Sequence, residues 1–542
     1  MDLFKNWLKK NSPSLLILAV LVFITYLNSF FNNFVSDDIS ILQQNPNLPF
    51  SYFLNPPLRI ARNIFIFLAY KAGYNNPFYY HMINIFFHIG MVWVSFILLS
   101  LMVNSTIAFL AAMIFSVHPI LTESVAWISG GVYVQYAFFL ISSLIFYIVN
   151  KKNSKFYFIS IVFFLLAIFT AADKAIIYPL LLFVYELSFG DLKKNWKSLI
   201  PFFLISFVTV FIYWQSGDIG QRIQSVQTNF YQKNTIYNPL IQIPIAITSY
   251  LQLLFWPDKL AFYHSEMSFS QVEYVIRLMG FIGLIGIIGY SWLKNKLIFF
   301  WLSFFIISLL PTLTPFGISW IVAERYVYLG SVGIIFIASY GLSALINNKE
   351  IEGIGYLIFI IIIISLMTRT IIRNFDWKNQ DTLWLATAKT SPSSSQNHNN
   401  LGDLYGRWGD LKRSAEEFKI ALKIDPSYAD VYNNLGNTYL QMGSRSAALE
   451  NYQLALKYNP NLWQSYQNIG VIYLEQGKLA SAEAEMQKAI KVFPNNPQLH
   501  VNLGVIYLKM NEKNKAKEAF YQALAIDPKN ERAKLGLIEV NK

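Results

Sequence analysis

The sequence predicts an all-α protein in two parts, a polytopic membrane helix bundle of about 11 spans followed by an α-solenoid of helical repeats. Two observations carry this prediction. Hydrophobic residues make up 54% of the 542-residue chain and charged residues only 14%, whereas soluble domains carry about 25% charged residues. Beyond about residue 395 the long apolar runs stop, and single residues recur every 34 positions.

Composition also excludes some chemistry. The chain has no cysteine, so disulfides, thiolate metal sites and cysteine nucleophiles are excluded. The formal charge of +12 would indicate nucleic acid in a soluble protein. Here the lysines mostly flank apolar runs, and the positive-inside rule explains them, so no nucleic-acid partner is predicted.

Eleven runs are apolar and long enough to cross a hydrocarbon layer of about 30 Å. They lie near residues 13–31, 77–102, 106–122, 132–150, 156–172, 175–190, 198–214, 274–293, 297–313, 326–346 and 354–372. The basic N-terminus resembles a signal peptide, but no small-residue cleavage site follows, so an uncleaved first span is predicted. Pro244, Gln252 and Pro257 interrupt the run 241–262, which we interpret as a re-entrant or interfacial segment.

Lysine clusters set the expected orientation. With the N-terminus inside, the clusters around Lys9, Lys155, Lys194 and Lys294 all fall on the cytoplasmic side. Eleven spans then place the repeats outside the cytoplasm of a bacterial plasma membrane, or in the ER lumen of a eukaryote. Basic residues after the last predicted span argue against this orientation. If residues 241–262 also cross the membrane, the C-terminus would lie on the cytoplasmic side.

The C-terminal third repeats with a period of 34. Glycines recur at Gly402, Gly436, Gly470 and Gly504, and prolines at Pro426, Pro460, Pro494 and Pro528. This spacing is typical of tetratricopeptide repeats, in which small residues let paired helices approach and proline ends each unit. Trp384 and Pro392 continue the phase backwards. The predicted organisation is a membrane domain over 1–373, a half-repeat helix over 374–394, and four repeats with a capping helix over 395–542.

Charged residues next to apolar runs are the candidates for chemistry, because burying charge in a membrane is costly. In the predicted topology these residues gather on one outer face, together with the neighbouring Tyr326. Asp37 and Asp38 are the catalytic candidates, and the candidates for binding the donor and its phosphate are Arg59, Arg62, His118, Glu123, Lys174, Glu324, Arg325 and Tyr326. An acidic pair near several cations is what a phosphorylated lipid substrate would need.

Structural alternatives exist for several of these residues. The segment "SDDISILQQ" has the residue types of a capped helix start. His118-Pro119 is compatible with a simple helix terminus, and Glu324-Arg325 with a structural ion pair. Lys174 is compatible with a lysine that extends to the membrane interface.

Four motifs resemble a known family. "FVSDDISILQQNPNL", "SVHPILTESVAWIS", "YLQLLFWPDKLAFYHS" and "AERYVYLGSVG", followed by the repeats, are similar to the transmembrane-and-tetratricopeptide O-mannosyltransferases and their bacterial relatives. These are lipid-sugar-dependent glycosyltransferases of the GT-C type. The resemblance implies an acidic catalytic residue in the first outer loop, matching Asp37-Asp38, and a polyprenyl-phosphate donor with a mannose-like sugar. The chain differs where the family often has Arg and Asp after Gly131, and where Ala172 replaces a Lys.

The expected mechanism uses one base. A carboxylate of Asp37 or Asp38 would deprotonate an acceptor hydroxyl, and attack opposite the lipid phosphate would invert the anomeric carbon. Arg325, with Arg59 or Arg62, would hold the departing phosphate. No cofactor is then required, although the two aspartates could hold a divalent cation.

The repeats have their own candidates for acceptor binding. Asn400, Asn434, Asn468 and Asn502 recur every 34 residues, and side-chain amides can pair with a peptide backbone without reading its sequence. The row resembles the asparagine ladder of O-GlcNAc transferases. The alternative is that these asparagines only support packing.

The sequence thus predicts a membrane glycosyltransferase that uses a polyprenyl-phosphate sugar and membrane lipid, with a protein or peptide acceptor held by the repeats. Two rival functions are a cell-envelope polysaccharide ligase or polymerase and a non-catalytic membrane scaffold. The ligase would be expected to have a large outer loop rich in Arg and His, and the scaffold would have no need for the acidic pair.

Overall fold

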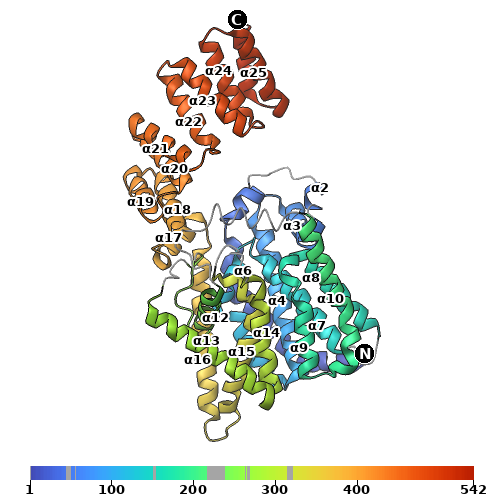
Figure 1. Ribbon diagram of the computed structural model, residues 1–542. Coiled ribbons are helices and arrows are strands. Elements are labelled where there is room, and N and C mark those ends of the chain that lie inside the picture. The colour runs from blue at the N-terminus through green and yellow to red at the C-terminus, as the bar shows by residue number, and fades with distance from the viewer. Residues whose placement is uncertain are drawn as a thin grey trace. The chain divides into compact units, whose positions relative to one another are not determined.

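The computed structural model describes residues 2–43, 50–54, 57–149, 154–216, 239–262, 264, 269–313 and 321–541. Every regular element within these ranges is a helix, so the predicted all-α class is confirmed. The chain divides into two compact units, Met1–Thr390 and Ser391–Lys542, and Figure 1 shows the helices of each.

Long helices build the first unit, and short turns of helix connect them. The longer ones are α1 (Asp2–Tyr26), α3 (Ile60–Gly73), α4 (Pro77–Met102), α5 (Ser105–Val117), α7 (Gly131–Val149), α8 (Ser154–Ala175), α9 (Tyr178–Ser188), α10 (Leu192–Gln215), α12 (Pro239–Phe255), α13 (Gln271–Lys294), α14 (Lys296–Leu309), α15 (Tyr328–Ile346), α16 (Glu352–Asp376) and α17 (Gln380–Thr390). The short ones are η1 (Leu27–Phe31), η2 (Ile39–Gln43), α2 (Phe50–Phe53), η3 (Pro57–Arg59), η4 (Pro119–Leu121), α6 (Thr122–Ala126), η6 (Leu310–Thr312) and η7 (Glu324–Val327).

A helix occupies each of the eleven predicted spans. Among the described residues, eight helices are long and apolar enough to cross a membrane, or nine if the bent pair α5 and α6 forms one span. Shorter apolar helices cover Tyr178–Ser188, Leu240–Phe255 and Lys296–Thr312. The interrupted run 241–262 begins as α12, which contains Pro244 and ends at Phe255. The number of spans and their orientation stay predictions.

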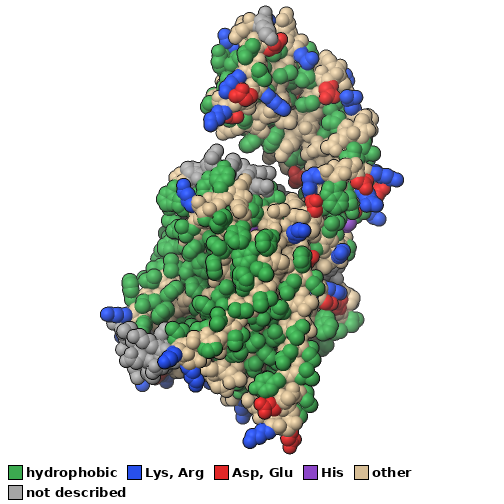
Figure 2. Space-filling view, turned by 180° about the vertical axis from the view of Figure 1, so that it is seen from behind, with side chains coloured by type: hydrophobic (Ala, Val, Ile, Leu, Met, Phe, Trp, Pro, Cys, Tyr) green, Lys and Arg blue, Asp and Glu red, His purple; other side chains and the backbone are tan. Residues whose placement is uncertain are grey.

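The helices differ in how much of their surface the bundle covers. Helices α4, α5, α7 and α15 pack against one another and form the core. Helix α13 buries only 6% of its apolar window, and α10 and α16 each bury 22%. Figure 2 shows hydrophobic side chains over most of one face of this unit, which is the surface that a lipid environment would cover.

Two breaks interrupt the helices near the predicted site. The chain bends by 54° between Ser105–Val117 and Pro119–Ala126, because Pro119 cannot continue the hydrogen bonding of α5. Helix α8 loses helical geometry at Ala171, where φ is −152° and ψ is 73°. Non-helical backbone at membrane depth is tolerated where protein buries it or where it lines a cavity.

The second unit is a stack of paired helices. The pairs are α18 (Ser395–Arg407) with α19 (Leu411–Ile424), α20 (Ala429–Gln441) with α21 (Arg445–Tyr458), α22 (Trp463–Glu475) with α23 (Leu479–Val492), and α24 (Pro497–Lys509) with α25 (Lys513–Ile526), and α26 (Glu531–Val540) packs on the last pair. The period of 34 has a steric cause. A Cβ atom added at Gly402, Gly436 or Gly504 would overlap the aromatic ring of the partner helix.

Helix α17 lies in the first unit. Its Trp384, which the 34-residue phase assigns to a truncated repeat, packs against Phe262 with 5.9 Å between ring centroids. Phe262 in turn contacts Trp377 at 5.4 Å. The aromatic position that a repeat would use internally therefore fastens α17 to the membrane unit.

The close approach at Gly436 can be tested. Gly436→Leu should destabilise the repeats by about 1–3 kcal/mol, because overpacking forces neighbouring helices apart and the Tyr452 ring occupies the space. Thermal unfolding followed by circular dichroism would measure the loss. Gln441→Leu, on an exposed position of the same helix, is the matched control. Equal melting temperatures for the two variants would contradict this account of the packing.

Candidate active site

A cavity of about 300 Å³ brings together more than half of the ten site residues predicted for the membrane unit. Its lining includes six of them: Asp37, Arg59, Arg62, Lys174, Arg325 and Tyr326. They come from the loop after η1, from η3 and α3, from α8, and from η7. Sequence reasoning missed Trp127, Ser129, Tyr133 and Asp173, which also line the cavity.

The two adjacent aspartates have different environments. Asp37 is exposed and lines the cavity. Asp38 is fully buried, and its Oδ1 accepts hydrogen bonds from the backbone N–H of Ser129 at 2.9 Å and from its hydroxyl at 2.5 Å. The N–H of Val35 donates to the other carboxylate oxygen at 3.4 Å. Asp38 therefore ties the loop to the segment between α6 and α7, while Asp37 is available to a ligand.

Burial changes the acidity of Asp38. Removal of the carboxylate from water raises the pKa of Asp38 to about 7, and the hydrogen bonds from Ser129 and Val35 oppose that rise. Its negative charge is therefore only partly developed at neutral pH. A buried and already hydrogen-bonded group suits a positioning role for its neighbour Asp37.

The loop that carries Asp37 is also anchored to the end of α16. The backbone N–H of Asn33 donates to the carbonyl of Lys378 at 2.8 Å. The side-chain amide of Asn32 donates to the carbonyl of Asn374 at 3.2 Å. The Asn374 amide donates in return to the carbonyl of Thr25 at 2.9 Å. These bonds hold the chain at the exit of the first helix against the exit of α16.

Arg325, a cation of the cavity wall, lies beside two aromatic rings. The guanidinium of Arg325 lies 5.6 Å from the ring centroid of Trp127 and 5.0 Å from that of Tyr326. Behind the wall it forms an ion pair with the buried carboxylate of Glu123. The Oε2 of Glu123 also accepts the backbone N–H of Arg325 at 2.8 Å. Glu123 therefore orients Arg325, and it is absent from the cavity lining.

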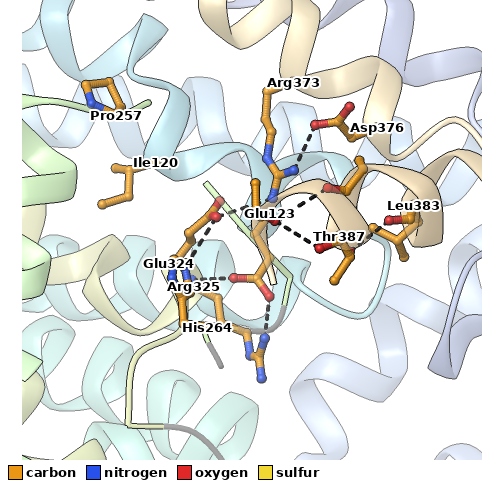
Figure 3. A network of polar contacts seen from close by, with 12 residues as sticks. Ile120, Glu123, Pro257, His264, Glu324, Arg325, Arg373, Asp376, Leu383 and Thr387 are labelled. Carbon is orange, nitrogen blue, oxygen red and sulfur yellow. Dashed lines mark hydrogen bonds and ion pairs between the residues drawn. The ribbon is translucent and has the colours of Figure 1, made fainter. Parts of the chain in front are cut away.

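Glu324 belongs to a second buried network, drawn in Figure 3. Its Oε1 lies 3.3 Å from a guanidinium nitrogen of Arg373 and 3.6 Å from Nε2 of His264. Arg373 also pairs with Asp376 at 2.8 Å. The structure thus places Glu324 beside the cavity wall with α16 residues. An arginine in the last turn of an apolar helix was the sequence signal that could have identified Arg373.

His118 lies at the bend between α5 and α6. Its Nε2 contacts the carbonyl of Leu254 at 2.9 Å, and its Nδ1 accepts the backbone N–H of Ile120 at 3.3 Å. The side chain is buried and does not line the cavity. It joins the bend to α12.

The asparagine row makes hydrogen bonds between neighbouring repeats. The Asn434 amide donates to Asn399 Oδ1 at 3.0 Å, and the Asn468 amide donates to Asn437 Oδ1 at 2.9 Å. Asn502 accepts a bond from Gln498 at 2.7 Å within its own helix. The first member of the row, Asn400, is half-buried on α18.

The site offers carboxylates but no compact set of metal ligands. Among the described residues no group of three or more His, Cys, Asp or Glu side chains could hold a metal ion. The cavity lining carries the carboxylates of Asp37 and Asp173 among four cations and several aromatic rings.

Family models identify the repeats. Models described as tetratricopeptide repeat match residues 429–462 and 473–534, and one described as TPR repeat matches residues 402–443. The crystal structure of the MamA protein is similar to part of this chain. The matched region covers 29% of this chain and 84% of the MamA chain, with 22% sequence identity and a TM-score of 0.25.

Sequence relatives extend into the membrane unit. The human protein named Protein O-mannosyl-transferase TMTC3 is 23% identical over 466 residues, covering 75% of this chain and 51% of its own length. The Caenorhabditis elegans Protein O-mannosyl-transferase F38B6.6 is 26% identical over 448 residues, covering 76% of this chain and 62% of its own. The chain spans about half to three fifths of these relatives. The predicted resemblance to the transmembrane-and-tetratricopeptide O-mannosyltransferases is confirmed, and this chain is related to them.

The buried state of Asp38 predicts a pH dependence of stability. Its folded-state pKa lies above the ordinary value of 3.8, so the folded chain holds one more proton than the unfolded chain between about pH 4 and pH 7. Stability present at low pH is lost as the pH rises through about 7, with a slope of at most about 1.4 kcal/mol per pH unit. Asp38→Asn should remove this slope.

Melting temperatures of the purified protein between pH 4 and pH 8 would measure the effect. Asp37→Asn, at the exposed neighbour, is the control and should keep the wild-type pH profile. Identical profiles for wild type and Asp38→Asn would show that Asp38 does not titrate as its burial predicts.

Proposed function

We propose that the chain is an inverting glycosyltransferase of the GT-C type that transfers a mannose-like sugar from a polyprenyl-phosphate donor to a hydroxyl of a protein or peptide. The observation that carries this proposal is the cavity in which exposed Asp37 shares a wall with four cationic side chains. A base beside an excess of positive charge suits a reaction with a neutral nucleophile and an anionic leaving group. The relationship to proteins named O-mannosyl-transferases supports the same reaction class.

The transfer needs one proton acceptor. Asp37 takes the proton of the acceptor hydroxyl while the hydroxyl oxygen forms a bond to the anomeric carbon of the sugar. The bond between that carbon and the phosphate oxygen breaks, and its electron pair leaves with the lipid phosphate. Attack from the face opposite the phosphate inverts the configuration. Positioned general-base catalysis of this kind typically contributes about 10²–10⁴-fold.

The cationic side chains of the cavity bind the leaving phosphate. Glu123 already neutralises Arg325, and Asp173 pairs with Lys174 at 2.7 Å. We assign the leaving phosphate to the three arginines of the cavity lining, Arg59, Arg62 and Arg325. A guanidinium can bind two phosphate oxygens in parallel, which stabilises the charge that develops as the bond breaks.

The repeats supply the acceptor in this proposal. The cavity and the repeats must share a compartment, so both would lie on the extracytoplasmic face. A peptide lying along the row of asparagines would pair its backbone with successive amides, and each net hydrogen bond contributes about 0.5–1.5 kcal/mol. The chemistry at the cavity does not depend on the row of asparagines.

Asp37→Asn tests the base. The substitution keeps size but removes the proton acceptor, so sugar transfer should fall about 10²-fold or more while expression and melting temperature hold. Transfer from radiolabelled polyprenyl-phosphate mannose to a protein acceptor is the measurement. Glu350→Gln, at an exposed carboxylate outside the cavity, is the matched control. Normal transfer by Asp37→Asn would rule out this mechanism.

A triple change of Asn434, Asn468 and Asn502 to Ala tests acceptor capture. The Michaelis constant for protein acceptors should rise by about 10-fold or more, because several backbone hydrogen bonds are lost together. Transfer to a small free acceptor should not change.

Asn437→Ala is the control for packing, because it removes the partner of Asn468 and leaves the row itself intact. It should lower the melting temperature without changing acceptor kinetics. If the triple variant also shows only a lower melting temperature, the row has a packing role alone.

A further inference from the structure

The proposed reaction assigns no role to the break in α8 at Ala171. Residues 170–174 line the cavity at this break, and no proline or glycine lies within α8 to cause it. Most sharp kinks have such a local cause. In membrane proteins, discontinuous helices often form substrate sites, because the interrupted backbone faces a polar cavity. The break therefore marks this part of the wall as a place for a polar ligand.

An ion pair between Asp173 and Lys174 lies at the break in α8, next to the ring of Tyr133. Lys174 Nζ lies 2.7 Å from Asp173 Oδ2, and the side chains are 15% and 35% exposed. Lys174 Nζ also lies 5.0 Å from the ring centroid of Tyr133, which is 6.0 Å from the ring of Tyr326. Hydrogen-bond donors, acceptors and ring faces thus meet at one corner of the cavity.

The part of the cavity around Asp173 and Lys174 differs in charge from the part lined by the arginines. The cavity lining carries four cations, Arg59, Arg62, Lys174 and Arg325, and two carboxylates, Asp37 and Asp173. The charges of Asp173 and Lys174 offset each other, and Arg325 pairs with Glu123 behind the wall. An anion gains its binding energy from the arginines, whereas the neutral pair matches a neutral ligand with hydroxyl groups.

We propose that the Asp173–Lys174 pair and the ring of Tyr133 form the subsite that binds the sugar of the donor. The inference rests on the proposed function. Adjacent ring hydroxyls can donate to Asp173 and accept from Lys174 at the same time, since a hydroxyl is both donor and acceptor. The apolar face of the sugar ring would lie against Tyr133. Asp173 and Lys174 are thereby specificity-determining residues, and the arginines hold the phosphate.

Two lipid ligands separate the sugar from the phosphate. Full-length purified protein would be titrated with a polyprenyl-phosphate hexose and with the same polyprenyl phosphate without sugar. Asp173→Asn and Lys174→Gln should each weaken binding of the hexosyl lipid by about 10- to 100-fold, the usual effect of losing a charge-assisted hydrogen bond. Binding of the bare lipid phosphate should hold. Arg62→Gln, by contrast, should weaken both ligands.

Two outcomes of this titration would contradict the proposed sugar subsite. Variants that keep the wild-type preference for the hexosyl lipid would overturn it. Equal loss of both ligands would also overturn it, because the pair would then serve the phosphate or the fold. Retained binding of the bare lipid shows that a variant is folded. The proposed function is tested separately by wild-type transfer, because absence of transfer refutes that function while the binding preference still decides whether a sugar subsite exists.

Discussion

The first unit is arranged around the burial of two carboxylates inside an apolar helix bundle. Glu123 and Glu324 are both fully buried, and an unpaired charge in such a place costs several kcal/mol. Each is therefore matched with an arginine, Glu123 with Arg325 and Glu324 with Arg373. Glu324 and Arg325 are adjacent in the chain but pair with different elements. The short helix η7 is consequently held between α6 and α16.

This pairing shapes one wall of the cavity. Arg325, held by Glu123, lies across the rings of Trp127 and Tyr326. Trp127 stacks on the buried Trp377 with 5.9 Å between centroids, just beyond the last turn of α16. The same end of α16 anchors the loop that carries the exposed aspartate. The positions of Asp37 and Arg325 therefore both depend on contacts with the end of α16.

Local patterns predicted much of this structure, and contacts between distant segments account for what they missed. Apolar runs and the 34-residue period depend on neighbouring residues, so the helices were predictable. Motif residues such as Asp37 and Arg325 were also identified, because charge beside apolar runs is conspicuous. The burial of Asp38 depends on Ser129, 91 residues away, and no local signal reveals it. The break at Ala171 has no proline or glycine to announce it, so Asp173 was overlooked.

The asparagine row shows why packing and ligand capture need not exclude each other. A side-chain amide has two donor hydrogens and an acceptor oxygen. Asn434 donates to Asn399, and Asn468 donates to both Asn437 and Asn433, so these bonds use the amide nitrogens rather than the acceptor oxygens. Those bonds also restrict rotation of the amides and orient them along the stack. Groups that are already ordered lose less conformational entropy when a ligand binds. The hydrogen bonds that join the repeats are therefore the same feature that would let a row of asparagines hold an extended peptide backbone.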